Sequence, residues 1–324
     1  MRRCLRGRRA GIRHWLHATL WAAACTTGAA HAADRILGPP EVAGIVIDAE
    51  LAEISGLAAS RTHPDVLWAI NDSGNPARLF ALSTHGRKLA AFDIDGASNV
   101  DWEDLAAFSL GDRHYLLIAD TGDNGGVRVT LDLLLVEEPR ALKSAHVALT
   151  RRLTFRWPDG PRDCEAMAVD AERGEILLLS KKRVPAQLFR LPLAALFAPV
   201  SNSTAVAEEI AHVRALPQPT AEELATSPRL GRYRAQVSGM ALRADGWLAI
   251  QTYRDTYLFH RPPAQSWRRV LRGAPQPLRI SVMPQPEALA FDPRTGDLFI
   301  ASERIPSPLL RLRAPPGAPS SPRK

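Results

Sequence analysis

Three glutamates recur at one place in a repeated sequence pattern: Glu103, Glu165 and Glu287. Each stands at the start of a strand-like segment, just before a small apolar pair. Glutamate is a poor turn former, so its recurrence at one register indicates more than a turn. Neighbouring carboxylates push each other's pKa values apart, which suits acid–base chemistry, and hard cations such as Ca²⁺ take oxygen ligands. We therefore treat the three as candidate catalytic or metal-holding groups.

Other ionisable residues follow the next apolar run of each repeat. Lys181 and Arg254 are candidates for binding the anionic part of a substrate and its transition state. The candidate ligands that would complete a calcium site are Asp72, Asp120, Asp123 and Glu303. Two structural interpretations stay open: aspartates at strand ends often form turns, and the two basic residues would neutralise the glutamates in a structural network.

The sequence repeat predicts the strands that position these residues. Five segments share a start in which Gly or Glu precedes a small apolar pair: 54–58, 101–106, 163–168, 237–241 and 285–290. A second apolar run follows each of them after a polar turn: 66–70, 115–119, 175–180, 247–251 and 297–302. Third strands are predicted at 78–82, 127–136, 187–191 and 255–260, and fourth strands at 88–94, 146–157, 204–216 and 267–271. Each unit is thus four short strands.

A lone four-stranded sheet cannot bury both faces, whereas several stacked radially can. We therefore predict an all-β fold, a β-propeller of five four-stranded blades. Six blades stay open if residues 217–230, which we expect to form an inserted loop with a helical turn, hide a degenerate blade. The last unit lacks a fourth strand, and residues 41–47 are predicted to supply it from the N-terminal side. A β-sandwich with extra strands is the alternative fold.

The propeller brings the charged residues together. The first strand of each blade lines the central channel and the second runs antiparallel beside it, so the start of the first and the end of the second meet at one rim. All the candidate residues lie at these two places. We expect one mouth of the channel to carry a ring of acidic and basic side chains.

The N-terminal segment predicts export. Residues 1–32 contain six arginines, no acidic residue, a short apolar run at 15–25 and an Ala-His-Ala ending, which together indicate a signal peptide. Removing them leaves 35 of the 41 basic residues against 34 acidic ones, so the net charge of +7 gives no reason to expect a nucleic-acid partner. A twin-arginine signal at Arg8 and Arg9 and a lipoprotein anchor at Cys25 are the alternatives. We expect the propeller to span 33–313 and residues 314–324 to form a disordered tail, in a periplasmic or secreted protein without a membrane-spanning segment.

The sequence has no motif for a disulfide-stapled fold, a catalytic thiol or the common cofactor and nucleophile sites. The mature chain would keep Cys164 alone, so no internal disulfide is expected, and no histidine stands at a matching rim position to activate this thiol. We expect Cys164 to be buried and Trp102 to pack between blades. There is no phosphate-cradling glycine loop, zinc pattern or nucleophile elbow, and we expect no organic cofactor.

The order of these motifs resembles the bacterial propeller proteins grouped as esterase-like activity of phytase. The resemblance spans nearly all of the mature chain and is carried by residues 101–106, 118–124 with Arg128, 138–139, 157–160, 163–166, 180–181, 237–240, 252–254 and 286–288. Gly122 departs from it, because an apolar residue is expected after Thr121. The resemblance implies a secreted propeller with ester or phosphoester hydrolysis, and a calcium-dependent activity of that kind would call for dense carboxylates with basic residues for phosphate.

The sequence therefore predicts a hydrolase of a small ester or phosphoester, with calcium as the metal and a small anionic or ester substrate. Two alternatives use the same residues. In one, a non-catalytic propeller binds a ligand or a protein partner, whose identity the sequence leaves unknown, through the same rim. In the other, the charged ring is purely structural.

Overall fold

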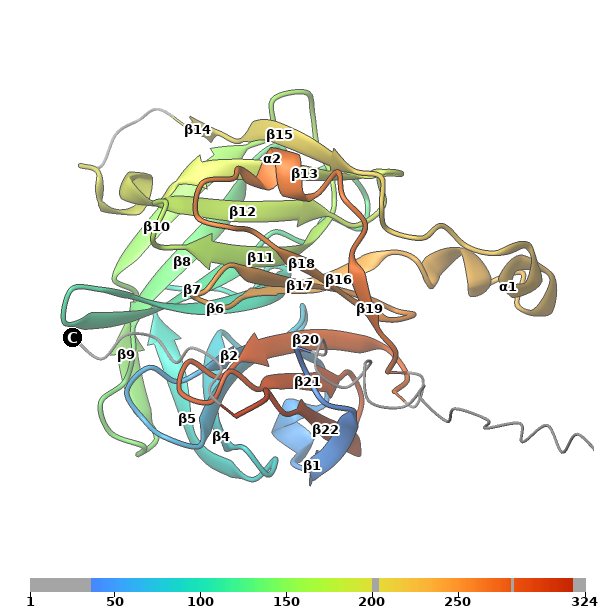
Figure 1. Cartoon of the computed structure of the whole chain (residues 1–324). Helices are drawn as coiled ribbons and strands as arrows, with labels where there is room; N and C mark the ends of the chain where they lie inside the picture. Colours follow the sequence, from blue (N-terminus) through green and yellow to red (C-terminus); the bar gives the residue numbers. More distant parts are fainter. Residues whose placement is uncertain (1–35, 200–203, 281–282, 317–324) are drawn as a thin grey trace, which may run out of the picture. The chain divides into compact units, whose positions relative to one another are not determined.

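The computed structural model describes residues 36–199, 204–280 and 283–316. Within these residues the strands form five sheets (Figure 1). The first strand of each sheet contacts the first strands of two other sheets, and the fifth contacts the first, so the sheets close into a ring. This confirms the predicted five-bladed β-propeller and excludes the sandwich.

Each blade has four strands that run outwards from the channel. The first blade is formed by β2 (Ile54–Ala59), β3 (Val66–Asn71), β4 (Arg78–Ser83) and β5 (Lys88–Asp95). The second is formed by β6 (Trp102–Leu110), β7 (Arg113–Asp120), β8 (Leu131–Glu137) and β10 (Arg151–Arg156). The third is formed by β11 (Cys164–Asp170), β12 (Glu175–Ser180), β13 (Ala186–Pro192) and β15 (Glu208–Val213).

The last two blades complete the ring. The fourth blade is formed by β16 (Val237–Leu242), β17 (Trp247–Thr252), β18 (Thr256–His260) and β19 (Gln276–Leu278). The fifth is formed by β20 (Pro286–Phe291), β21 (Leu298–Ser302), β22 (Ser307–Leu312) and β1 (Pro40–Val46). Because β1 pairs antiparallel with β22, the prediction that an N-terminal strand completes the last blade is confirmed.

Two predicted fourth strands are divided between blades. The segment 146–157 forms β9 (Ala145–Ala148), which pairs in parallel with β5 of the first blade, and then β10. The segment 204–216 forms β14 (Ala205–Val206), which pairs in parallel with β10, and then β15. Each of these short strands, β9 and β14, extends the sheet of the preceding blade. The sequence repeat does not reveal this pairing, because it describes one blade at a time.

The prediction of a strand at 267–271 is wrong, because this segment begins with the short helix α2 (Trp267–Val270). Its apolar residues Trp267, Val270 and Leu271 are spaced by three and four, which is the helical period. The Trp267 indole packs in the apolar cluster between the third and fourth blades and donates a hydrogen bond to Asp170 Oδ2 at 2.9 Å. The fourth strand of this blade is β19, further along the chain.

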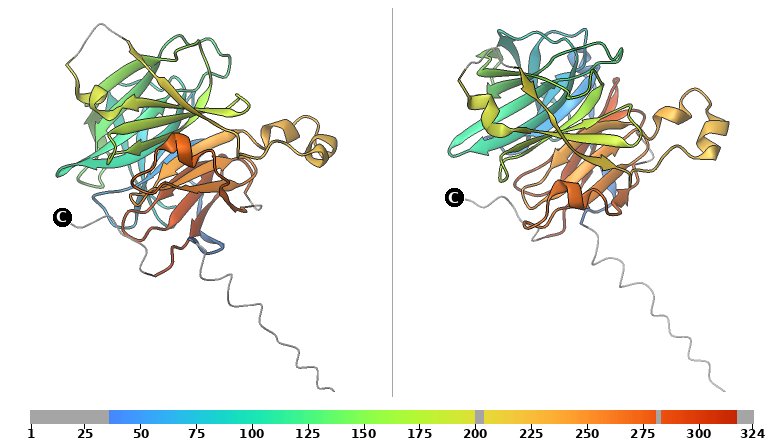
Figure 2. Two further views of the ribbon diagram at one scale, coloured as in Figure 1. Left: turned by 45° about the horizontal axis from the view of Figure 1, so that its top comes forward. Right: turned by 90° about the horizontal axis from the view of Figure 1, so that it is seen from above.

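The predicted insertion lies between β15 and β16. It contains α1 (Ala221–Thr226), whose N-terminus has a capping box between Thr220 and Glu223, and a short 3₁₀ turn (Gly231–Tyr233). It projects from the sheets in all views (Figure 1, Figure 2). The described residues of this segment therefore form helical turns rather than a sixth blade.

The hydrophobic core is divided among the blade interfaces, with one apolar cluster between each pair of neighbouring blades. Trp102 is fully buried in the cluster between the first and second blades, as expected. The predicted signal peptide and most of the predicted tail lie outside the described residues. Among the residues that are described, no helix has the length and apolar character needed to cross a bilayer.

Candidate functional site

Every first strand carries a β-bulge at its second residue. The pairing of first and second strands shifts between Ile54 and Gly56, and equivalent shifts occur in the other four blades. The bulged residues are Ser55, Glu103, Glu165, Ser238 and Glu287. A bulge re-aims a side chain at the rim of a sheet. The three predicted glutamates therefore occupy equivalent positions around one mouth of the channel.

A hydroxyl group from the preceding blade holds the backbone before each of these glutamates. Ser55 donates to the carbonyl of Trp102, Thr121 to that of Cys164 and Ser238 to that of Pro286, each at 2.7 Å. All three hydroxyl-bearing residues are buried. The backbone next to each glutamate is therefore held both by its own blade and by a hydrogen bond from the preceding blade.

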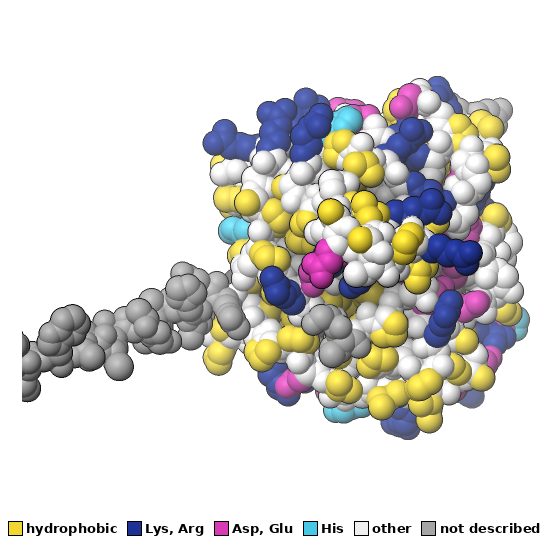
Figure 3. All heavy atoms as spheres, turned by 90° about the vertical axis from the view of Figure 1, so that its right-hand side faces the viewer, with side chains coloured by type: hydrophobic (Ala, Val, Ile, Leu, Met, Phe, Trp, Pro, Cys, Tyr) yellow, Lys and Arg dark blue, Asp and Glu magenta, His cyan; other side chains and the backbone are white. Residues whose placement is uncertain are grey.

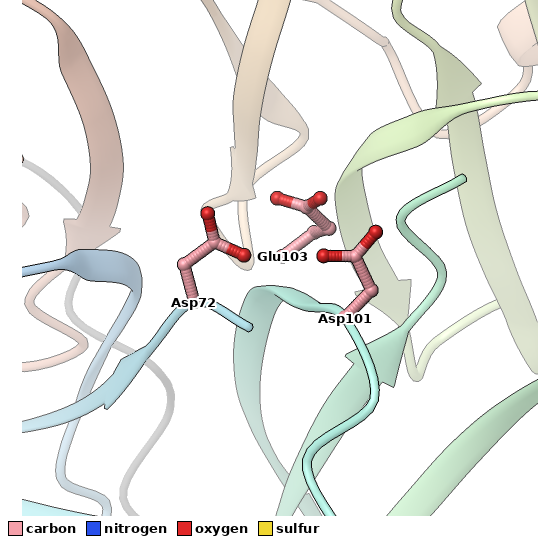
Figure 4. Close-up of side chains that lie close together, drawn as sticks. All are labelled: Asp72, Asp101 and Glu103. Carbon is pink, nitrogen blue, oxygen red and sulfur yellow. The ribbon is translucent and has the colours of Figure 1, made fainter. Parts of the chain in front are cut away.

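Two close groups of carboxylates share Glu103. One consists of Asp72, after β3, together with Asp101 and Glu103 at the start of β6, and their oxygens lie within 4.8 Å of one another. Their carboxylates turn toward one another (Figure 4). The other group consists of Glu103, Asp163 and Glu165 and meets the same limit. We call these the first and second carboxylate groups.

The first carboxylate group concentrates negative charge without a direct ion pair among the described residues. Burial raises the pKa of Glu103 well above its usual value, and the charges of Asp72 and Asp101 raise it further, against the charge of Lys181. Burial, followed by the charge of Asp72, raises the pKa of Asp101 to about 6. Among the described residues, none donates a hydrogen bond to the Glu103 carboxylate, which is 6% exposed. At neutral pH this group therefore requires protons or a cation.

Lysines compensate the second carboxylate group. Lys181 Nζ contacts the Glu165 carboxylate directly, and both side chains are largely buried. Lys182 Nζ lies 2.9 Å from Asp163 Oδ2 and 2.8 Å from Asn124 Oδ1. Asp163 Oδ2 is buried and accepts no hydrogen bond among the described residues, so the Lys182 ammonium compensates it as an ion pair. The first group is the stronger candidate for a metal, because it has no basic partner of this kind.

Glu287 pairs with Tyr253, which follows β17. The Tyr253 hydroxyl donates to Glu287 Oε1 at 2.8 Å, and Lys181 Nζ lies 5.4 Å from the centre of the Tyr253 ring. Burial and the charge of Glu303 raise the pKa of Glu287 to about 8, against the hydrogen bond from Tyr253. Tyr253 was missed from sequence because phenols are neutral in the physiological range, although it stands at the rim position where charged residues were sought.

Four other predicted residues lie outside both groups. Asp120 accepts one hydrogen bond from Arg128 at 2.8 Å, and Asp123 accepts hydrogen bonds from the backbone amides of Val127 and Arg128. Arg254 Nε donates to Glu223 of α1 at 2.8 Å, so its guanidinium is paired with the insertion. Glu303 accepts a hydrogen bond from Gln285 at 3.0 Å and lies near enough to Glu287 to raise the pKa of that carboxyl.

Gly122 lies against the first carboxylate group, where there is no room for a side chain. A Cβ added at this residue would lie 2.2 Å from Glu103 Oε1 and 2.4 Å from the Asp101 carboxylate. Any side chain would therefore displace the first carboxylate group. Cys164 is fully buried, and burial raises the pKa of its thiol to about 12, in agreement with the expectation of an inert thiol.

Asp104 follows Glu103 in β6 and is bonded to three blades. Its fully buried carboxylate accepts hydrogen bonds from the backbone amides of Leu105 at 2.8 Å, Met167 at 2.7 Å and Met240 at 3.2 Å. It therefore ties three blades together at the axis. The equivalent residues of the other blades are small and uncharged (Gly56, Ala166, Gly239 and Ala288), and this contrast was the available signal in the sequence.

The acidic mouth lies at the start of the first strands, on the right in Figure 1, where β20 begins. This side faces the viewer in Figure 3. Basic side chains are spread over its surface, whereas acidic ones are few there (Figure 3). Glu103, Asp163 and Glu165 add little to this surface, because all three are buried.

No protein-family model and no curated protein matches the sequence, so the resemblance to the phytase-like propellers has no support from these comparisons. The fold is similar to that of a luciferin-regenerating enzyme (9% identity, TM-score 0.44, covering 84% of this chain and 95% of that chain). It is also similar to a gluconolactonase from Xanthomonas campestris (13% identity, TM-score 0.42, covering 86% of this chain and 97% of that chain). A third similar structure is regucalcin, a calcium-binding protein from Agrobacterium tumefaciens (12% identity, TM-score 0.40, covering 84% of this chain and 93% of that chain). At such low identities and TM-scores, these similarities carry no argument about the chemistry of this chain.

Proposed function

We propose that this protein is a metal-dependent hydrolase of a small ester or phosphoester, with its active site at the acidic mouth. The observation that carries the proposal is the first carboxylate group, in which Glu103 is buried and Asp72 and Asp101 are half-buried. Among the described residues no basic side chain forms an ion pair with this group, and Lys181 and the Tyr253–Glu287 pair lie near it. Asp72, Asp101 and Glu103 would hold Ca²⁺, which prefers carboxylate oxygens. When bound, the cation would polarise the phosphoryl or carbonyl oxygen of the substrate.

The residues around this group would supply the acid, the base and the cation that the hydrolysis needs. Glu287, with a pKa of about 8, carries a proton at neutral pH and gives it to the leaving oxygen as the ester bond breaks. The attacking water bonds to phosphorus or to the carbonyl carbon and loses its proton to Glu165. The ammonium of Lys181 stabilises the oxyanion that develops.

Arg254 would bind the anionic part of the substrate after leaving Glu223. Among the four calcium ligands expected from sequence, Asp72 is placed in the first carboxylate group. Glu303 stands beside Glu287, where it would keep that carboxyl protonated. For Asp120 and Asp123, the hydrogen bonds to Arg128 and to backbone amides favour a structural role in holding the 122–128 loop.

The test uses chelator-treated mature protein, assayed against generic phosphoesters and carboxyl esters with and without added Ca²⁺. We expect hydrolysis of one class, dependent on the metal and lost in Glu103→Gln and Glu165→Gln. Glu208→Gln, an exposed change on the outer strand of the third blade, is the matched control. Calcium binding without turnover of either class would overturn the hydrolase proposal and favour a ligand-binding propeller.

We also propose that the protein is exported to the periplasm or beyond, on the basis of the signal-peptide pattern in residues 1–32. The test is fractionation of cells that express the full chain. N-terminal sequencing should place the mature start near Ala33. Recovery of the uncleaved chain in the cytoplasm would contradict export.

A further inference from the structure

The channel opens at its other end into a cavity of 1020 Å³. The turns that join the first and second strands line it, so it lies at the opposite mouth from the carboxylate groups. A neck of 30 Å³, lined by the first strands, leads from it toward Asp104. A volume of this size accommodates a small organic ligand. The cavity is therefore separate from the proposed active site.

Four arginines line this cavity, and two of them are paired with acids. Arg243 makes two contacts with Asp245, at 2.7 and 2.8 Å. Arg261 lies 3.3 Å from Asp170 and 3.5 Å from Glu172. These guanidinium groups are neutralised within the fold.

The other two, Arg61 and Arg294, have no carboxylate within 4.0 Å among the described residues. Backbone carbonyls hold them instead. Arg61 Nη2 donates to Ala107 O at 2.9 Å, and Arg294 donates to Ser60 O and Arg61 O, each at 2.9 Å. These bonds fix the two guanidinium groups in place without neutralising their charge.

The acidic residues near Arg61 and Arg294 already accept hydrogen bonds from other groups. Glu138 accepts hydrogen bonds from the Trp68 indole at 2.8 Å and from the Arg61 amide at 3.1 Å, and Asp292 accepts one from the Arg294 amide at 2.7 Å. Both attract Arg61 only from beyond ion-pair distance. Asp112 is a further carboxylate that lines the cavity, and it is exposed to solvent.

The two guanidinium groups also repel each other. Burial lowers the pKa of Arg61, the charge of Glu138 opposes this effect, and the charge of Arg294 lowers the pKa further. Arg61 is half-buried and Arg294 is exposed, so an anion between them would relieve their repulsion and compensate the partly desolvated charge of Arg61. The planar fork of a guanidinium matches the oxygens of a carboxylate or a phosphate.

We propose that this second mouth binds a small molecule that carries a carboxylate or a phosphate group. Its oxyanion would lie against Arg61 and Arg294, and its apolar part would lie against Phe108, Val169 and Leu242, which line the same cavity. The site is independent of the hydrolase proposal, because the neck and Asp104 lie between the two mouths.

The test is calorimetry on chelator-treated protein with two probes, inorganic phosphate and benzoate, which distinguish the two oxyanions. We expect at least one probe to bind, and we expect Arg61→Gln and Arg294→Gln each to weaken its binding by about tenfold or more. Arg61→Lys, which keeps the charge and loses the fork, should lie between these variants and the wild type.

Two controls locate the binding. Arg140→Gln removes an exposed charge elsewhere and should leave the affinity unchanged. Lys181→Met removes a cation at the acidic mouth, and a loss of affinity in this variant would place the binding there and overturn the proposal. Unfolding temperatures measured without a probe show whether each variant is folded. The proposal is overturned if the wild type binds neither probe, or if folded Arg61→Gln and Arg294→Gln variants bind as the wild type does.

Discussion

Tyr253 donates a hydrogen bond to Glu287 from the neighbouring blade, at 2.8 Å, and this bond lowers the pKa of a carboxyl that burial raises to about 8. The fourth and fifth blades therefore jointly set the proton affinity of one group at the acidic mouth. In the proposed hydrolysis this group is the acid, so its environment sets the alkaline limit of activity.

Tyr253→Phe tests this relationship. Without the phenolic donor the Glu287 carboxylate is less stable, so its pKa should rise above the wild-type value. We expect the alkaline limb of the pH–rate profile to move to higher pH while the acid limb stays in place. Tyr233→Phe, in the insertion, is the control. An unchanged alkaline limb would show that Glu287 is not the acid.

The stability of the metal-free protein should fall as the pH rises. The folded-state pKa values of Asp101 (about 6) and Glu287 (about 8) lie above the ordinary values of 3.8 and 4.5. Between the two values of each group the folded state binds more protons than the unfolded state, so the free energy of unfolding decreases with pH in that window.

Calcium should reverse this trend, because the metal binds the deprotonated carboxylates and its stabilisation therefore grows with pH. The measurement is the unfolding temperature from about pH 5 to about pH 9, with chelator and with Ca²⁺. Equal curves under the two conditions would argue against a metal at the first carboxylate group.

Gly122→Ala should damage the metal site without changing its charge. The added methyl would lie against Glu103 Oε1 and the Asp101 carboxylate, so these ligands must move apart. We expect calcium affinity, measured by calorimetry, to fall by about tenfold or more. Gly125→Ala is the matched control, because its Cβ would meet only Val127 at ordinary contact distances of 3.6 and 3.8 Å. Equal affinities in the two variants would contradict the placement of the metal.

Asp104→Asn should destabilise the propeller. Oδ1 of Asp104 accepts from Leu105 and Oδ2 accepts from both Met167 and Met240, so an NH₂ group in place of one oxygen leaves either the Leu105 amide or the amides of Met167 and Met240 without an acceptor. A buried donor left in this way costs about 1–3 kcal/mol. Urea unfolding of the metal-free protein measures the change. A variant as stable as the wild type would show that Asp104 does not hold the three blades.

The sequence allowed the ring to be predicted because each blade repeats its first strand. The recurrence of glutamate at one register identified Glu103, Glu165 and Glu287 as neighbours around one mouth, and the unpaired segment at 41–47 identified the closing strand. These conclusions follow from periodicity and from the need of every strand for a partner.

Other features depend on contacts that have no local signature. The pairing of Arg254 with Glu223 requires the insertion to fold beside the fourth blade. The bonds of Asp104 come from the backbone of three blades, and backbone donors carry no residue type to read. Asp120 and Asp123 look like metal ligands in sequence, yet their oxygens are engaged by Arg128 and by the amides that follow them.

The pairing of β1 with β22 joins segments from opposite ends of the propeller, Pro40–Val46 and Ser307–Leu312. During synthesis β1 has no strand to pair with until β22 emerges, so the pairing of β1 with β22 forms late. Such a long-range pairing forms slowly and leaves a strand edge open in the meantime. A polypeptide that is threaded N-terminus first through a membrane before it folds would meet the same delay on the far side, because Pro40–Val46 would arrive there before Ser307–Leu312.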